Sequence, residues 1–474
     1  MTSPTYTAAT APDRDGLAAA VFTGLTPGTR YWWAVELDGT LETGHLGTFR
    51  TLPAPGEPTS FSFAAASCAD TNSNADSFAD AAARTGPTGE PALFTVHLGD
   101  MHYQDIGTDD PAWALAAWLN ALGQPNQAAL YAAAPLAYTW SDHDFGGSNV
   151  AADSPAAAAV QAVYRRLVPS HPLPGDGAGI YQSWQVGRVL FVMTDGRSYA
   201  SPITAPDTAT KTKLGAAQKA WLKDQFAAPG VGLVIWCHED AWHNASTFTG
   251  DDTWSAYATE RAELAAYIQA NDVPLLYVHG DVHALSHDDG SHVPGRFPLI
   301  SVSPWDQTTF IGNGALTSGF YPDPVSTTVK SQQYGWFDVL DNGTQIVVRA
   351  LGIADGQVVL RTEMSWGITR HLGWGIPCDR AEVRCPMTPP SASSRAFWLT
   401  SAPTSATTSP RSTPAWTRSS CGTCTPPTGP PSNSGWRGWN ARPRPRAQPR
   451  APRSTAASAP CSPRSWPGSC SPCC

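Results

Sequence analysis

The short stretch LGDMHYQD, residues 98–105, places carboxylate, imidazole and phenol side chains at the end of an apolar run. Asp100 and Tyr103 lie three residues apart, directly after a segment with the composition of a buried strand. In open α/β sheets, ligands bind in the crevice at the carboxyl ends of the strands, where both side chains could reach one point. A solvated aspartate beside a packed tyrosine is the alternative. The choice depends on whether other polar residues converge at the same edge.

Five further strand-like runs between residues 60 and 362 also end in cysteine, aspartate or histidine. Segments with Ala and Leu at helical spacing separate several of them, as at 111–124, 214–227 and 259–271. Buried strands alternating with helices predict an α/β domain with its site at the strand ends. The polar residues at those ends are Cys68, Asp100, Tyr103, Asp142, His143, Asp144, Asp195, His238, Asp281 and His283. Thiolate, carboxylate, phenolate and imidazole in one cleft form a metal site, and there are enough groups for two ions.

Composition excludes several classes of protein. The chain has 474 residues with a formal net charge of −9, which allows one large domain and a smaller one at about 150 residues each. No apolar run approaches the roughly 20 residues of a membrane span. An acidic chain without basic runs argues against nucleic acid as a structural partner. We therefore expect a soluble, monomeric globular protein.

The composition changes after residue 370. Residues 371–474 contain 12 Arg, no Lys, two acids and eight of the ten cysteines, among many Pro and Ser. Such a segment cannot bury enough apolar surface to offset its ordering entropy, so we expect a disordered tail. Its mixture of residues is typical of the product of GC-rich DNA translated in the wrong reading frame. Cys421 and Cys424 lack a second pair at zinc spacing, so no zinc site is expected there.

The front of the chain has a different pattern. Residues 16–53 alternate apolar and polar side chains in short runs broken by Pro-Gly and Asp-Gly turns, which predicts antiparallel β-structure. The stretch LTPGTRY, residues 25–31, is similar to one in fibronectin type III-like sandwiches. A sandwich of that kind needs about seven strands. Residues 1–55 hold three or four, so we expect a partial domain, truncated at its front.

Four blocks in the larger domain resemble a known superfamily. GDMHY (99–103), SDHD (141–144), CHEDAWHNA (237–245) and GDVHA (280–284) follow the block order of calcineurin-like metallophosphoesterases. Together with TDGRSYA, LGAAQKAWL and DDTWSAYATER, they are more narrowly similar to the alkaline phosphatase D family, from about residue 15 to 365. The resemblance implies a four-layer α/β/β/α sandwich over residues 60–365 that hydrolyses phosphoric esters.

The resemblance also implies a role for individual residues. Asp100 matches the carboxylate that bridges two metals, and His143 matches the group that protonates the leaving group. Asp142 and Asp281 stand where the superfamily has Asn and His. The other implied metal ligands are Cys68, Tyr103, His238 and His283.

These ligand types indicate particular metals. Carboxylates at the second position favour hard ions, whereas thiolate, phenolate, carboxylate and imidazole suit Fe³⁺ at the first. We expect a dinuclear or larger site with Fe³⁺ and Ca²⁺, and Mn²⁺, Mg²⁺ or Zn²⁺ as alternatives. His238 is unusual beside a hard cation and could instead orient a water or a phosphate. Arg197 could clamp a phosphate oxygen of the substrate, or pair with Asp195 for structure.

The implied chemistry is attack on phosphorus by a hydroxide. Two cations about 3.5–4 Å apart lower the pKa of a shared water, and His143 protonates the departing alkoxide, a role worth about 10²–10⁴-fold in rate. Small-molecule or lipid phosphate esters are the expected substrates. One rival is a phosphodiesterase or phospholipase D-like enzyme on the same fold. A non-catalytic surface module that uses the front domain for adhesion is the other.

Localisation is a conflict between the family and the chain. The family is generally exported, which implies a secreted or extracellular protein. The first residues have neither a basic segment nor an apolar core of the kind a signal peptide needs. We expect an upstream in-frame extension that encodes both a signal and the rest of the front domain.

Overall fold

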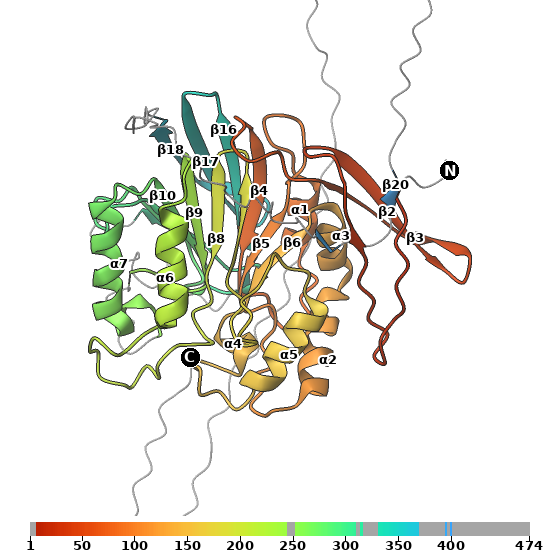
Figure 1. Ribbon diagram of the computed structural model, residues 1–474, viewed down its shortest axis with the longest axis horizontal. Coiled ribbons are helices and arrows are strands. Elements are labelled where there is room, and N and C mark those ends of the chain that lie inside the picture. The colour runs from red at the N-terminus through yellow and green to blue at the C-terminus, as the bar shows by residue number, and fades with distance from the viewer. Residues whose placement is uncertain are drawn as a thin grey trace, which may run out of the picture. The chain divides into compact units, whose positions relative to one another are not determined.

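The computed structural model describes residues 6–243, 252–309, 313–315 and 330–368, with the backbone of two short strands beyond them. All of these residues fall within one compact unit, Met1–Ser405. Its centre consists of a seven-stranded and a six-stranded sheet (Figure 1).

The seven-stranded sheet carries the later strands of the predicted domain. In spatial order its strands are β14 (Gly314–Ala315), β11 (Leu285–Asp288), β12 (Leu299–Val302), β10 (Leu275–His279), β9 (Leu233–His238), β8 (Val189–Met193) and β7 (Gln182–Val186). The strands β8, β9, β10 and β12 are parallel, so their carboxyl ends lie at one edge of the sheet. The helices α6 (Gly215–Phe226) and α7 (Ala258–Ala270) cover its outer face, with the short η1 (Trp254–Tyr257) before α7.

The six-stranded sheet combines early and late segments of the chain. Its spatial order is β18 (Gln357–Gly367), β17 (Gln345–Ala354), β16 (Gln333–Asp341), β4 (Phe61–Ala66), β5 (Thr95–Leu98) and β6 (Leu136–Thr139). Here β4, β5 and β6 are parallel. The helices on its outer side are α1 (Asp76–Ala83), α2 (Pro111–Leu122), α3 (Pro125–Ala133) and α5 (Ala157–Leu167), with the short α4 (Asp142–Phe145) after β6.

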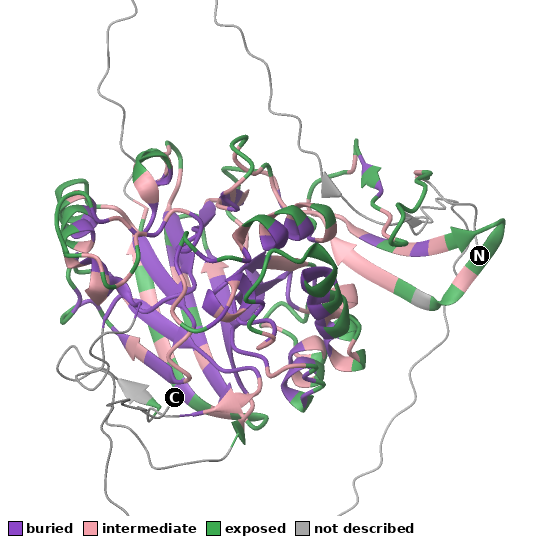
Figure 2. Cartoon of the chain, turned by 90° about the horizontal axis from the view of Figure 1, so that it is seen from below, coloured by how far each residue is buried: buried purple, intermediate pink, exposed green. Residues whose placement is uncertain are grey.

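Strand β9 shows why the strands are nearly continuous apolar runs. Val234 and Trp236 pack in the cluster beneath α6 and α7, whereas Leu233 and Ile235 pack in the cluster between the sheets. Successive side chains of a strand point to opposite faces, so a sheet covered on both faces needs apolar residues at every position. Buried residues accordingly gather on the strands of both sheets (Figure 2). The predicted four-layer α/β/β/α sandwich is confirmed.

The front of the chain forms antiparallel strands as predicted. β2 (Arg30–Leu37) and β3 (Thr40–Arg50) make a hairpin, and β20 (Leu399–Thr400) pairs with β2. β1 (Val21–Phe22) pairs with β19 (Ser394–Arg395). Tyr31 is buried in a small apolar cluster with Ala20 and Phe22. The likeness to a fibronectin type III domain stays a prediction.

Two segments of the later chain fall largely outside the described residues. Apart from β19 and β20, the predicted disordered tail 371–474 lies outside the described residues, as do Cys421 and Cys424. The short strands β13 (Gln307–Thr308) and β15 (Lys330–Ser331) pair on either side of another such segment. Among the described residues, no helix has the length and apolar character needed to cross a bilayer.

Replacing Phe63 tests the packing between the two sheets. Its fully buried ring stacks on Phe337 with centroids 4.6 Å apart and meets Phe191 of the other sheet edge to face at 5.1 Å. We expect Phe63→Ala to lower the free energy of unfolding by about 3–5 kcal/mol, because it leaves a cavity at this junction. Urea unfolding measures the loss. Val359→Ala, at a side chain 50% exposed on β18, is the control and should change stability by no more than about 0.5 kcal/mol; equal effects would contradict this view of the core.

Candidate metal centre

The turns after β4 and β10 bring the carboxyl edges of the two sheets together. Ser67 Oγ accepts a hydrogen bond from the backbone N–H of Asp281 at 3.1 Å. A Cβ atom on Gly280 would lie only 2.2 Å from the same Ser67 oxygen, so only glycine allows this approach. Cys68 Sγ, from the six-stranded sheet, consequently lies 4.0 Å from the Asp281 carbonyl oxygen of the seven-stranded sheet.

Four predicted ligands share an unusual backbone conformation. The φ angles of Cys68, Asp100, Asp281 and His283 are 59°, 54°, 67° and 50°. Non-glycine residues seldom adopt positive φ. Such residues persist where the surrounding structure over-determines them, and they cluster at functional sites. The strand-end positions singled out from sequence are therefore special in their backbone as well as in their side chains.

The first group of ligands surrounds one oxygen of Asp100. Asp100 Oδ2 accepts hydrogen bonds from the Cys68 thiol at 3.4 Å and the Tyr103 hydroxyl at 3.1 Å. The Tyr103 hydroxyl also lies 3.2 Å from His283 Nε2. His283 Nδ1–H donates to the Thr308 carbonyl at 2.7 Å, which leaves the lone pair of the neutral ring on Nε2. Cys68, Asp100 and His283 thus offer ligand atoms within 4.8 Å of one another.

Burial controls the protonation of this group. It raises the pKa of the Cys68 thiol, and it raises the pKa values of Asp100 and Tyr103 well above their usual ranges. Burial also lowers the pKa of His283 to about 4, so its imidazole is neutral. Burial thus favours the protonated forms of the three acids, and a bound cation would replace their protons.

One oxygen of Asp100 fits a cation directly. Asp100 is 2% exposed, and its Oδ1 has no hydrogen-bond partner among the described residues. Leaving a buried polar atom unpaired costs about 1–3 kcal/mol, and a metal ion would satisfy it. The donor set of thiol, phenol, carboxylate and neutral imidazole is one that transition metals accept. The residues present therefore fit a metal centre.

A second group of residues also includes Asp100. Asp100, Asp142 and His143 offer ligand atoms within 4.8 Å of one another. The carboxylate of Asp142 accepts backbone hydrogen bonds from His143 at 2.9 Å and Asn149 at 2.7 Å. Although burial opposes its charge, Arg197, His143 and these N–H groups lower the pKa of Asp142 to about 2. Asp142 is thus a fixed, charged carboxylate.

Asp144 ties the two ligand loops together. Its Oδ1 accepts from the backbone N–H of Met101 at 2.9 Å, and its Oδ2 accepts from that of Ser141 at 3.1 Å. The second bond belongs to the capping box at the start of α4. Gly99 packs so closely here that a Cβ atom on it would lie 2.5 Å from the Ser141 nitrogen. These contacts therefore fix the position of the loop after β5 relative to the loop after β6.

His143 has the surroundings of a proton donor. Its Nδ1–H donates to Asp105 Oδ1 at 2.6 Å. Burial lowers its pKa, but Asp100, Asp142 and Asp105 outweigh that effect and raise the pKa of His143 to about 9. The ring therefore carries both protons at neutral pH when no metal is bound. Asp105 stands in the opening stretch of the sequence, but no role was predicted for it.

A third group of acids lies next to the centre. Asp240, Asp252 and Asp281 offer oxygens within 4.8 Å of one another. Asp240 and Asp252 were not among the predicted site residues, although both fall in blocks that resemble the family. Asp240 is the last residue of the strand-like run 232–240, but only His238 was taken from that strand end. Asp252 ends no such run, so the strand-end signal did not reach it.

Comparisons with known proteins agree with this geometry. Residues 63–295 match the family model of PhoD-like phosphatases. Residues 63–295 thus form a domain of that family. The solved structure of PhoD is 19% identical over 74% of this chain and 76% of that chain, with a TM-score of 0.52, and it shares the fold. Among curated proteins, none matches the chain.

Two other solved structures are similar at lower scores. The purple acid phosphatase PPD1 from yellow lupin (Lupinus luteus) seeds is 12% identical over 72% of this chain and 60% of that chain, with a TM-score of 0.44. GAP50, the anchor in the inner membrane complex of Plasmodium, is 13% identical over 66% of this chain and 90% of that chain, with a TM-score of 0.40. The match of residues 63–295 to the PhoD-like phosphatase model indicates a phosphatase-type hydrolase.

In this PhoD-like phosphatase, His238 lies apart from the first two groups. Its Nδ1 is 2.8 Å from Thr194 Oγ1, and its ring centroid is 5.4 Å from that of Trp254. The ligand atoms that group with His238 are those of Glu239 and Asp240.

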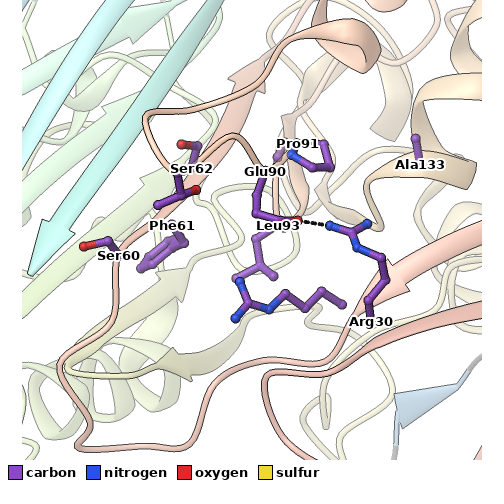
Figure 3. Close-up of a pocket in the computed structure, with 11 residues that line it drawn as sticks. Arg30, Ser60, Phe61, Ser62, Glu90, Pro91, Leu93 and Ala133 are labelled. Atoms are coloured by element: carbon purple, nitrogen blue, oxygen red, sulfur yellow. Dashed lines mark hydrogen bonds and ion pairs between the residues drawn. The ribbon is translucent and has the colours of Figure 1, made fainter. Parts of the chain in front are cut away.

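The pocket lined by Arg30, Arg50 and Glu90, where Arg30 pairs with Glu90, contains none of the predicted site residues (Figure 3).

The guanidinium of Arg197 pairs with carboxylates of the protein itself. Its guanidinium, 1% exposed, bonds Asp240 at 2.5 Å and also bonds Asp252. Lys213, fully buried, pairs with Asp240 as well. The predicted pairing with Asp195 occurs through the backbone N–H of Arg197, at 3.0 Å, and not through the guanidinium.

Replacing Arg197 separates a structural role from a phosphate clamp. Arg197→Met should lower the free energy of unfolding by about 3–5 kcal/mol, because it leaves Asp240 and Asp252 buried with less compensation. Denaturant unfolding of the metal-free protein measures this. Arg349→Met, which breaks the exposed pair with Glu363, is the matched control and should lose about 1 kcal/mol at most. Unchanged stability with a raised KM would instead support the phosphate clamp.

Proposed function

We propose that this chain is a metal-dependent phosphoric ester hydrolase of the alkaline phosphatase D type, with a centre of at least two cations. The observation that carries the proposal is the position of Asp100. It is common to both the group with Cys68 and His283 and the group with Asp142 and His143, and its buried Oδ1 has no hydrogen-bond partner in the part of the chain that the structure describes. A carboxylate shared in this way is suited to bridge two ions.

The proposed ligands divide between two positions. Cys68, Tyr103 and His283 would hold the first cation together with Asp100, and this set favours Fe³⁺. Asp142 would hold the second cation, and Asp281 lies next to the centre in its own acidic group. Hard oxygen ligands favour Ca²⁺, with Mn²⁺ or Mg²⁺ as alternatives. His238 stays a predicted ligand whose place beside Glu239 favours an orienting role.

The protein's own residues handle the proton and the substrate's position. When bound, paired cations would supply a water of lowered pKa and neutralise phosphate oxygens. His143, whose Nδ1–H is held by Asp105, would donate a proton to the oxygen of the leaving group as its bond to phosphorus breaks. The neutral imidazole of His283 keeps its lone pair on Nε2 because Nδ1–H is held by Thr308.

Tyr103 tests the identity of the first metal. Phenolate bound to Fe³⁺ absorbs visible light, so the purified protein should be coloured, and Tyr103→Phe should bleach or shift the band. The fold should survive, because the change removes one oxygen. Visible spectroscopy with metal analysis measures the outcome. Colourless, iron-free protein with full activity would exclude the iron assignment, and an unchanged band in the variant would exclude Tyr103 as a ligand.

His143 tests the proposed reaction. His143→Ala should keep the bound metals but lower kcat by about 10²–10⁴-fold for an alkyl phosphate ester, whose leaving group needs a proton. A para-nitrophenyl ester, with a good leaving group, should lose far less. Metal content is measured on the same samples. Loss of metal, or equal rate losses for both esters, would count against the assignment.

The same assay separates the rival esterase activities. We expect the wild-type protein to hydrolyse para-nitrophenyl phosphate and to stop when the metals are chelated. Bis(para-nitrophenyl) phosphate is the matched diester. A higher kcat/KM for the diester would favour the phosphodiesterase alternative, and inactivity on both would favour the non-catalytic module.

A further inference from the structure

The hydroxyl of Ser67 lies between the two sheets, next to the first group of ligands. Ser67 follows β4, directly precedes Cys68 and is fully buried. Its Oγ lies 3.0 Å from Cys68 Sγ, and it accepts the backbone N–H of Asp281 at 3.1 Å. Within the part of the chain that the structure describes, these are the two hydrogen bonds of the hydroxyl. Ser67 therefore touches a predicted ligand from each sheet.

The direction of the bond between Ser67 and Cys68 follows from the protons available. A serine hydroxyl has one proton to donate. Toward Asp281 the Ser67 oxygen is the acceptor, so its own proton is not used there. The single proton of the Cys68 thiol points to Asp100 Oδ2, at 3.4 Å. The Ser67 O–H is consequently the donor in the bond to sulfur.

Backbone packing holds the Ser67 hydroxyl in this place. A Cβ atom on Gly280 would lie 2.2 Å from Ser67 Oγ and 2.5 Å from Ser67 Cβ, so the backbone of Gly280 closes the space on that side. The carbonyl oxygens of Ser67 and Cys68 accept the N–H groups of Trp305 at 2.7 Å and Asp306 at 3.2 Å. Neighbouring segments on both sides thus fix the serine relative to the sulfur.

We propose that Ser67 is a positioning residue of the metal centre, whose hydroxyl donates a hydrogen bond to the Cys68 thiolate. The proposal rests on the proposed function, in which Cys68 is a ligand of the first cation. When a cation replaces the thiol proton, the sulfur keeps its negative charge, and hydrogen bonds to charged acceptors are the stronger ones. Hydrogen bonding around a cysteine sulfur tunes the metal that it binds. Ser67 thus limits how much electron density Cys68 gives to the metal.

The experiment uses Co²⁺ as a probe, loaded into the metal-free, full-length protein. A cobalt–thiolate bond absorbs in the near ultraviolet, whichever metal the protein carries naturally. Cys68→Ser should remove this band, which assigns it. Ser67→Ala should move the band to longer wavelength, because a sulfur without the hydrogen bond gives up charge more readily. The same variant should lower the affinity for Co²⁺ by about 10–100-fold, as is typical when a partner of a metal ligand is lost.

Ser62→Ala is the matched control on the same strand. Ser62 is buried at the other end of β4, and its hydroxyl donates to Asp338 Oδ1 at 2.7 Å, away from the predicted ligands. This variant should keep the band and the affinity of the wild type. If Ser67 only held the Asp281 backbone, Ser67→Ala would lower the affinity for Co²⁺ without moving the band. That result would overturn the proposal.

Deuterium tests the same bond without a substitution, should Ser67→Ala fail to fold. In wild-type protein refolded in D₂O, resonance Raman spectra should show a shifted cobalt–sulfur stretch, because the proton bonded to sulfur is exchangeable. An unshifted stretch would also overturn the role of Ser67. If the near-ultraviolet band survives in Cys68→Ser, Cys68 itself is not a ligand, and the first cation position of the proposed function falls together with this proposal.

Discussion

The contact between the turns after β4 and β10 is the constraint on which the site depends. Each parallel sheet brings its ligands to its own carboxyl edge, but neither edge alone holds a complete set. Because Gly280 has no side chain, its backbone reaches Ser67, and the Ser67 hydroxyl binds the N–H of Asp281. Cys68 and Asp100 from one sheet then lie beside Asp281 and His283 from the other. The two-sheet core, packed through rings such as Phe63, holds those edges in register.

Charge explains how so many acids share a buried place. Beside Asp281, the carboxylates of Asp240 and Asp252 are compensated by two buried cations, Arg197 and Lys213. Around Asp100 the compensation is weaker, because burial and the neighbouring acids outweigh His143 and raise the pKa of Asp100. The first region is therefore neutralised by the protein, whereas the proposed metal ions would replace protons in the second. Metal affinity should accordingly rise with pH.

Much of the fold and part of the site could be predicted from the sequence. Apolar runs with both faces buried, such as Leu233–His238, identified the strands, and their polar ends predicted Cys68, Asp100 and His283, whose side chains lie together. Asp105 and Asp252 could not be identified in this way. They belong to connecting segments, where spacing carries no information about which residue from another loop lies alongside.

Arg197 shows a second limit of sequence reasoning. Arginine can serve either as a phosphate clamp or as an internal counter-ion, and burial distinguishes the two roles. The guanidinium is 1% exposed because loops from distant parts of the chain close around it. That closure is a property of the tertiary fold, which no local pattern around TDGRSYA reveals.

The left-handed backbone at the ligand positions restricts which amino acids can occupy them. Asparagine, aspartate and histidine adopt positive φ several times more readily than other non-glycine residues. Asp100, Asp281 and His283 belong to that set, and Cys68 is the exception. Glutamate has the same carboxylate as aspartate but lacks its preference for this conformation. Divergence of this centre should therefore exchange aspartate, asparagine and histidine with one another, so that its metal preference can drift while the backbone stays unchanged.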